Sequence, residues 1–500
     1  MNRRTSATLI LTAWAGALGW LVQRHYFGTA RASDQPGWPV PPSSAFHAIR
    51  VGTRQHGLAS LTVDTIASKL QVTELVTLDL PPLTPEATRR TTYRIMARYS
   101  RGLQLEGWQG DLLTEQGRLQ STGAVSGDTL LRVVNTAPTE LPETLTVPLR
   151  RPVILPSAIP LVAASRGLPR PGSKLNLEIY DPLDQELRTE RMMIAAESVF
   201  SVPDSADYSE TLRRWRIAHS DTVRAWRLDA VEHGLTVSRW VDASGQTVRV
   251  EHPLGAILER SAFEIVNSNY RALKRVPWDS GSTVPSYLET NGKEAALRSL
   301  RVVAHVDPDQ PLPAGLPSLE GGWQERSGDT LLVAPRAAVD TGPEPPVLVE
   351  ALIDQDTAMA RIAGTVTGRD PRPEGQVRAL TDWVRRTITL RTGAGGTTAG
   401  RTLARRSGTS EERVRLLVAL ARSVGFEARP VWGLARIDRG WQLRTWAEIR
   451  TGTWTPADPA LSAREAPAGR IRLATGGRPR LLDLALRAGR LRLEVLEDTP

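Results

Sequence analysis

The residues of this 500-residue sequence that could carry chemistry gather between positions 405 and 460, where Ser410 and Glu412 stand in the first block and Asp458 in the last. A serine nucleophile needs a neighbouring general base, which is usually histidine. The sequence contains no cysteine, and no histidine follows His305. This stretch therefore offers a hydroxyl group and carboxylates, but neither a thiol nor an imidazole of its own.

The element that must position Ser410 is a helix, and the sequence predicts one that ends at Gly425. Apolar residues recur at helical spacing on two adjoining stripes, which predicts a buried helix. Thr409 and Glu412 form a capping-box pattern that satisfies free backbone N–H groups at the helix start. The stripes are Val414, Leu417, Val418 and Ala421, and Leu416, Leu420 and Val424.

Three further blocks follow this helix: a β-like run over 428–434, the segment 444–448 and the segment 454–459. The four blocks together resemble the transglutaminase-like family, a branch of the papain-like thiol enzymes. The family pattern is Gly-x-Cys-x-Glu on a helix, Leu-Ala-Arg-x-x-Gly-x-x-Ala-Arg, His-Ala-Trp-x-Glu and Trp-x-x-x-Asp-Pro. The resemblance extends over residues 351–461 and implies an α+β domain.

The resemblance places Ser410 where the family has its nucleophilic cysteine and Arg444 where it has its histidine, and it retains Glu412 and Asp458. A papain-like nucleophile depends on a thiolate paired with an imidazolium ion. Ser410 cannot form that pair, and Arg444 stays protonated and cannot be a base. These degenerate triad positions predict a pseudoenzyme.

A binding role remains for the cleft, which is expected to hold a peptide or an envelope polymer strand. Its candidate binding residues are Glu412, Trp446 and Trp454, with both tryptophans as core or groove-lining aromatics. Two alternatives stay open. The fold could be only a structural scaffold, or Ser410 could be the nucleophile of a transglutaminase or peptidase-like hydrolase whose base is His219, His233, His252 or His305.

Arg444 and Asp458 are also expected to form an ion pair in place of the family's His–Asp contact. No metal site is expected, because the chain lacks cysteine and no histidine pair has metal-ligand spacing. The Gly-rich run 391–400 lacks the Gly-Lys-Ser/Thr ending of a phosphate loop. No cofactor is predicted.

The N-terminus has the form of an export signal, with Arg3 and Arg4 before an uncharged run over 7–22. We expect residues 1–28 to be a signal anchor or signal peptide, followed by a linker over 29–44. The body would then be membrane-anchored and extracytoplasmic, in the periplasm or at the cell surface.

Residues 45–288 alternate between apolar and polar over many short runs, which predicts a large antiparallel β-rich domain, either a curved sheet or a sandwich. A Pro-rich stretch over 141–171 would connect its halves. The motif Ser-Gly-Asp-Thr-Leu-Leu occurs at 126–131 and 327–332, which we interpret as repeated turn chemistry rather than a duplicated ligand loop.

The remaining regions are a connecting β segment over 289–345, the transglutaminase-like domain over 346–465, and C-terminal strands over 466–500. Helices are expected over 354–363 and 375–387. The net charge of +9 comes almost entirely from arginines spread along the chain, so we expect no nucleic acid partner. Contact with an anionic membrane surface or envelope polymer is compatible with this charge.

Overall fold

The computed structural model describes residues 40–499 except for the gaps at the end of this paragraph. The predicted signal segment over 1–28 and most of the linker over 29–44 lie outside the described residues. Within the described ranges, no helix is long and apolar enough to cross a membrane. The gaps are 53, 67–68, 80–89, 115–116, 128, 137–141, 168–170, 184, 233–234, 254, 273–296, 307–320, 335–356, 392–397, 438–439, 461–467 and 477–490.

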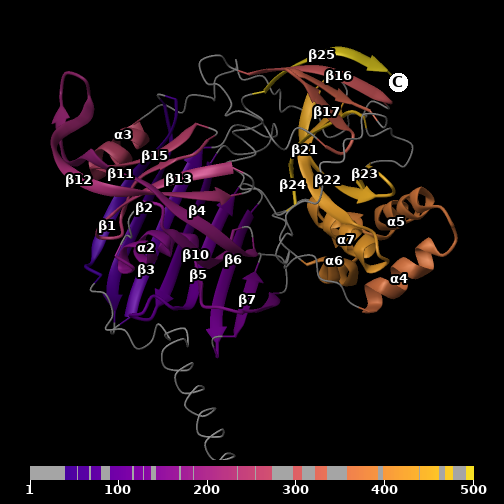
Figure 1. The fold of residues 1–500 in the computed structure, drawn as a ribbon, viewed down its shortest axis with the longest axis horizontal. Helices are drawn as coiled ribbons and strands as arrows, with labels where there is room; N and C mark the ends of the chain where they lie inside the picture. The colour runs from indigo at the N-terminus through magenta and orange to yellow at the C-terminus, as the bar shows by residue number, and fades with distance from the viewer. Residues whose placement is uncertain are drawn as a thin grey trace, which may run out of the picture.

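The first half of the chain forms one 15-stranded sheet (Figure 1). Its order runs from β8 to β1 and then from β15 to β9, so sequence neighbours pair except where β1 pairs with β15, and only β9 and β10 are parallel. The predicted large antiparallel β-rich domain is confirmed. The strands are β1 (Ser43–Val51), β2 (Arg54–Ile66), β3 (Lys69–Asp79), β4 (Arg90–Tyr99), β5 (Leu105–Thr114), β6 (Gly117–Ser126), β7 (Leu130–Thr136), β8 (Glu143–Pro148), β9 (Val153–Ile154), β10 (Lys174–Asp181), β11 (Glu186–Ser209), β12 (Arg214–Glu232), β13 (Leu235–Asp242), β14 (Thr247–Glu251) and β15 (Ala256–Ser261).

The sheet must curl, because β8 and β9 stand at opposite ends of the strand order and only residues 149–152 separate them in the chain. Strand β8 alternates strictly between buried and exposed residues, so one of its faces points into a core. Leu145 and Val147 of β8 share that core with Ile154 of β9. The two ends of the sheet therefore enclose the same apolar interior.

A short helical segment fills part of this interior, within the Pro-rich stretch predicted only as a connection. The 3₁₀ turn η2 (Pro156–Ala158) leads into α2 (Ile159–Ser165), whose first six residues are buried. A Cβ atom on Gly245, in the turn between β13 and β14, would lie 3.0 Å from the Cα atom of Leu161. Helix α2 thus packs directly on the sheet (Figure 1).

Strands β11 and β12 have 24 and 19 residues. They are much longer than the runs 190–195 and 223–228, in which the alternation of apolar and polar residues predicts strands. They form a hairpin that extends beyond the neighbouring strands (Figure 1). Val199 and Ile217 on this hairpin are 60% and 59% exposed. The last strand of this sheet in the chain, β15, is followed by a π-helical turn, η3 (Glu264–Ser268), and by α3 (Asn269–Ala272).

The described residues of the second half of the chain form two four-stranded sheets and four helices (Figure 1). In one sheet, β25 from the C-terminus pairs with β16 from the connecting segment. The other, ordered β23-β22-β21-β24, belongs to the transglutaminase-like region. The strands are β16 (Ser299–Val306), β17 (Gln324–Ser327), β18 (Thr330–Val333), β21 (Ala428–Ile437), β22 (Gly440–Arg450), β23 (Trp454–Ala457), β24 (Arg470–Thr475) and β25 (Leu491–Thr499).

Helix α7 is the centre of the transglutaminase-like region, and residues 412–421 of it are all buried. Its apolar side chains form a core with α4, α5 and residues of β21 and β22. The helix predicted over 354–363 corresponds to α4, which is described from Thr357 and ends at Thr367. The helix predicted over 375–387 corresponds to α5, which starts two residues earlier. The helices are α4 (Thr357–Thr367), α5 (Pro373–Thr387), α6 (Ala399–Arg405) and α7 (Ser410–Ser423), with the short parallel pair β19 (Thr389–Leu390) and β20 (Ser407–Gly408) beside them.

The large sheet contacts the transglutaminase-like region through its edge strand β8. The buried carboxylate of Glu143 accepts a hydrogen bond from the backbone N–H of Thr398, at 2.9 Å. Arg401 donates to the backbone carbonyl of Pro142 at 3.1 Å. Burial raises the pKa of Glu143, while the bonds from Thr398 and the charge of Arg401 lower it.

Candidate functional site

Ser410 is the first residue of α7 and is partly exposed. Thr409 caps the helix, since its hydroxyl accepts from the Glu412 N–H at 3.3 Å and its own N–H donates to the Glu412 carboxylate at 2.8 Å. The predicted capping box is therefore confirmed. It fixes Ser410 at the helix N-terminus, the position at which a papain-like enzyme would carry its thiolate.

The Glu412 carboxylate has no exposed surface and is held by two arginines in addition to the cap. Arg391 donates to both of its oxygens at 3.1 Å, and Arg405 donates to Oε2 at 3.2 Å. A Cβ atom on Gly408 would lie 3.3 Å from Oε2, so the backbone also approaches closely here. This geometry makes Glu412 an internal anchor of the helix start rather than a surface that a ligand could touch.

Arg444 lies on β22 opposite Gly433 of β21 and is partly exposed. Its Nε atom is buried and has no hydrogen-bond partner among the described residues. A guanidinium group keeps its proton under all ordinary conditions, so it can bind an anion but cannot accept a proton from Ser410.

Asp458 follows β23 and is almost fully buried. Its Oδ1 accepts from the Ala460 N–H at 2.8 Å, and its Oδ2 lies 3.5 Å from Nη2 of Arg470. Within the described residues the ion pair of Asp458 is thus with Arg470, and the predicted pair with Arg444 is wrong. Asp458 also lies close enough to α7 to raise the pKa of Arg413, although burial lowers that pKa more strongly.

A second buried cluster surrounds Glu448, the glutamate of the segment 444–448. Arg429 donates to Glu448 Oε2 from Nε at 2.9 Å and from Nη2 at 2.7 Å, and Arg472 lies 3.4 Å from the same oxygen. The Arg429 guanidinium also stacks 4.0 Å from the centre of the Trp454 ring. This contact combines cation–π attraction with apolar packing.

Both predicted tryptophans support the site from inside. Trp446 is 2% exposed, with the Arg470 guanidinium 5.9 Å from its ring centre, and Trp454 is 9% exposed. Together with the full burial of Glu412, this leaves none of the three candidate binding residues on an open surface. The tryptophans act as core aromatics, which is one of the two roles that the sequence indicates.

The arginines that contact Glu412, Glu448 and Asp458 were not predicted from the sequence. They lie in different elements, and the abundance of arginine along the chain hides their individual roles. The alternation over 470–473 is the one local signal, because it puts two arginines on one side of an otherwise apolar strand. The set comprises Arg391, Arg405, Arg429, Arg470 and Arg472.

The described histidines proposed as a base lie outside residues 346–465. His219 is on the exposed β11–β12 hairpin, where its Nδ1 lies 2.9 Å from Asp204, and His252 follows β14 and lines a cavity in the large sheet. His233 lies outside the described residues. His305 is on β16, whose Leu300 and Val302 share a core with residues of β21 and β24.

Comparison with known proteins bears on this region. Residues 360–459 match the family model of the transglutaminase-like superfamily. A comparison with curated proteins finds no match.

Two solved structures share low similarity with the chain. A putative cysteine protease from Cytophaga hutchinsonii is 17% identical, covers 41% of this chain and 84% of its own, and has a TM-score of 0.22. A β-barrel-like protein with a domain of unknown function from Brucella abortus is 9% identical, covers 44% and 94%, and has a TM-score of 0.29. Neither superposition is close enough to inform the fold or the activity. The family match, however, coincides with α4–α7 and β21–β23, and residues 360–459 are a transglutaminase-like domain.

Proposed function

We propose that the transglutaminase-like domain is catalytically inactive and that the protein binds a peptide or an envelope polymer. The observation that carries this proposal is the pair of residues at the family's nucleophile and histidine positions. Ser410 and Arg444 cannot form a thiolate–imidazolium pair, and a serine hydroxyl is a weak nucleophile without an adjacent base. The role left to the site is recognition.

The chemistry around Arg444 indicates the kind of ligand. The residue is partly exposed, and its buried Nε has no hydrogen-bond partner among the described residues. The other arginines of the site are committed to Glu412, Glu448 and Asp458. Arg444 is therefore the group that would hold a carboxylate of an anionic peptide or polymer, since guanidinium and carboxylate match in bidentate geometry.

Replacing Arg444 by alanine tests this role. A charge-assisted hydrogen bond contributes about 1.5–3 kcal/mol, so Arg444→Ala should weaken binding of a glutamate-containing peptide or of isolated peptidoglycan by about 10-fold or more. Arg450→Ala, on the same strand but paired with Glu427, is the matched control and should bind like wild type. Pull-down and fluorescence anisotropy measure both. Equal binding by wild type and Arg444→Ala would rule out this ligand contact.

The location of the protein is a separate part of the proposal. A basic start followed by an uncharged run over 7–22 supports an N-terminal anchor with the body outside the cytoplasm. Expression of the full chain in bacteria, followed by protease treatment of intact spheroplasts, tests it. The body should be digested while cytoplasmic markers survive, and a protected body would contradict export.

The alternative function, a hydrolase that uses Ser410, requires a base from outside the transglutaminase-like domain. His219 and His252 lie in the large sheet, and His219 is paired with Asp204. These observations favour the binding role. Ammonia release from a glutamine-containing peptide, compared between wild type and Ser410→Ala, separates the two functions.

A further inference from the structure

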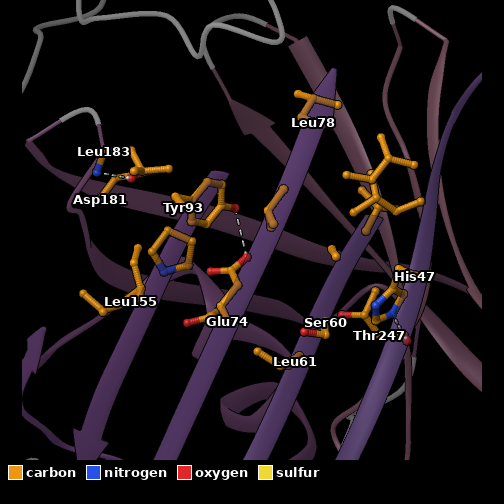
Figure 2. A pocket seen from close by; sticks show the side chains of 18 of the residues that line it. His47, Ser60, Leu61, Glu74, Leu78, Tyr93, Leu155, Asp181, Leu183 and Thr247 are labelled. Atoms are coloured by element: carbon orange, nitrogen blue, oxygen red, sulfur yellow. Dashed lines mark hydrogen bonds between the residues drawn. The ribbon is translucent and has the colours of Figure 1, made fainter. Parts of the chain in front are cut away.

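The concave side of the large sheet holds a cavity of about 290 Å³. Its walls come from β1–β5 and β13–β15, and the segment 155–160 before and within α2 covers part of it. Figure 2 shows side chains from these strands pointing into the space. Protein interiors are normally packed so closely that few voids exceed one water molecule. A cavity of this size is therefore a feature that the fold maintains rather than a packing defect.

Most of the lining is aliphatic, and several of its residues still reach solvent. Leu61, Leu78, Leu183 and Leu258 pack against the apolar cores and yet are only partly buried. Partly exposed leucines inside a concave surface leave apolar area in contact with water, which an apolar ligand would cover. The cavity is thus open to solvent and apolar.

The polar groups at the wall are largely occupied by protein partners. The Tyr93 hydroxyl donates to the Glu74 carboxylate at 3.1 Å, and these two side chains point toward each other in Figure 2. On the other side of the view, His47 Nε2 lies 2.9 Å from the Thr247 carbonyl oxygen. A ligand in the cavity would therefore make mainly apolar contacts.

The charged residues of the lining indicate whether the head group of an apolar ligand would be charged or neutral. Glu74 and Asp181 contribute two carboxylates to the lining, against one arginine, Arg239. His47 is neutral near pH 7, because burial lowers its pKa to about 4. Asp181 is paired with Arg188 at 3.8 Å, and Arg239 is buried and has a protein partner. An incoming carboxylate would therefore lose its hydration without gaining a free cation, and a neutral ligand avoids this cost.

We propose that this cavity binds the hydrocarbon chain of a neutral amphiphile. At about 30 Å³ for a water-sized group, the volume accommodates about ten such groups, which corresponds to a chain of about ten carbons. It is about twice the engineered apolar cavity of about 150 Å³ in another protein that takes up benzene. This site is distinct from the transglutaminase-like domain and does not depend on the function proposed for it.

The test uses the full chain and the neutral fluorescent probe N-phenyl-1-naphthylamine. Leu78→Trp places a large side chain in the cavity at a partly exposed position, so the fold should tolerate it. Leu113→Trp, at a residue of the same sheet that is 56% exposed and outside the lining, is the matched control. Wild type and Leu113→Trp should bind one probe per chain, and Leu78→Trp should bind at least 10-fold more weakly.

Displacement identifies the ligand class. 1-Decanol should displace the probe from wild type, and decanoate should be at least 10-fold less effective at pH 7.5. If Leu78→Trp loses its native circular dichroism spectrum, Leu61→Phe replaces it. Equal probe binding by wild type and the cavity variant would overturn the site, and equal displacement by decanoate would overturn the preference for a neutral ligand.

Discussion

At the scale of single residues, the site is organised by buried carboxylates held by arginines. Glu412, Glu448 and Asp458 occupy positions of the family pattern, and each contacts at least one guanidinium group. A buried ion pair adds little net stability when intact, but removal of one partner leaves an uncompensated charge inside the protein. Each pair therefore balances a carboxylate charge that would be costly to leave unpaired inside the protein.

Removing the charge of Glu412 should destabilise the start of α7. Glutamine at this position keeps the capping-box hydrogen bonds but removes the charge that compensates Arg391 and Arg405. Glu412→Gln should lower the free energy of unfolding by about 3–5 kcal/mol, measured by urea denaturation.

Glu427→Gln is the control for this prediction. Glu427 pairs with Arg450 at the surface, where the two side chains are 65% and 34% exposed, and a surface pair contributes less than about 1 kcal/mol. A loss in Glu412→Gln no larger than in Glu427→Gln would mean that the arginine contacts do not stabilise the helix start.

At the scale of elements, one buried histidine links strands that are not neighbours. His47 on β1 lies 2.9 Å from the Thr247 carbonyl on β14, across the intervening β15. Burial is the main reason why its pKa falls from 6.5 to about 4, with a further decrease from Arg260 and an opposing increase from the Thr247 bond. The imidazole is therefore neutral in the folded state at every pH above that value.

This shift predicts a loss of stability in mild acid. Between pH 6.5 and 4 the unfolded chain binds a proton at His47 that the folded chain does not, so stability falls as the pH decreases. The His47 contribution at pH 5.5 relative to pH 7.5 is a loss of about 1.4 kcal/mol. Burial also lowers the pKa of His56, so part of the pH dependence should remain in every variant. Urea denaturation should therefore show a loss of stability between pH 7.5 and 5.5 that is about 1.4 kcal/mol smaller in His47→Gln than in wild type or in the exposed control His219→Gln. A pH dependence unchanged in His47→Gln would show that another group is responsible.

Local elements were predictable from sequence, and long-range ones were not. The periodicity and capping pattern of α7 lie within one stretch of chain, and Gly127 and Gly328 adopt positive φ angles at the two repeated turns, as turn chemistry requires. The pairing of β16 with β25 instead joins segments far apart in the sequence. The arginine contacts of Glu412 and Asp458 likewise depend on tertiary structure. Alternation also fails to define β11 and β12, because both faces of their outer halves are exposed.

At the scale of the whole molecule, two bodies with different chemistry share one chain. The large sheet encloses an apolar cavity, whereas the transglutaminase-like domain contains buried carboxylates paired with arginines and no histidine. They meet where Glu143 of β8 accepts from Thr398 at the start of α6, whose last residue, Arg405, holds Glu412. A continuous set of contacts therefore connects the edge of the large sheet with the helix that carries Ser410.

The central claim is that this transglutaminase-like domain has no catalytic activity. The most direct test is ammonia release from a glutamine-containing peptide, with and without an amine acceptor, by wild type, Ser410→Ala and Ser410→Cys, beside an active transglutaminase. All three forms should stay at the buffer baseline, and cysteine should not rescue activity because Arg444 cannot act as a base. Turnover by wild type that Ser410→Ala abolishes would contradict the claim and identify Ser410 as a working nucleophile.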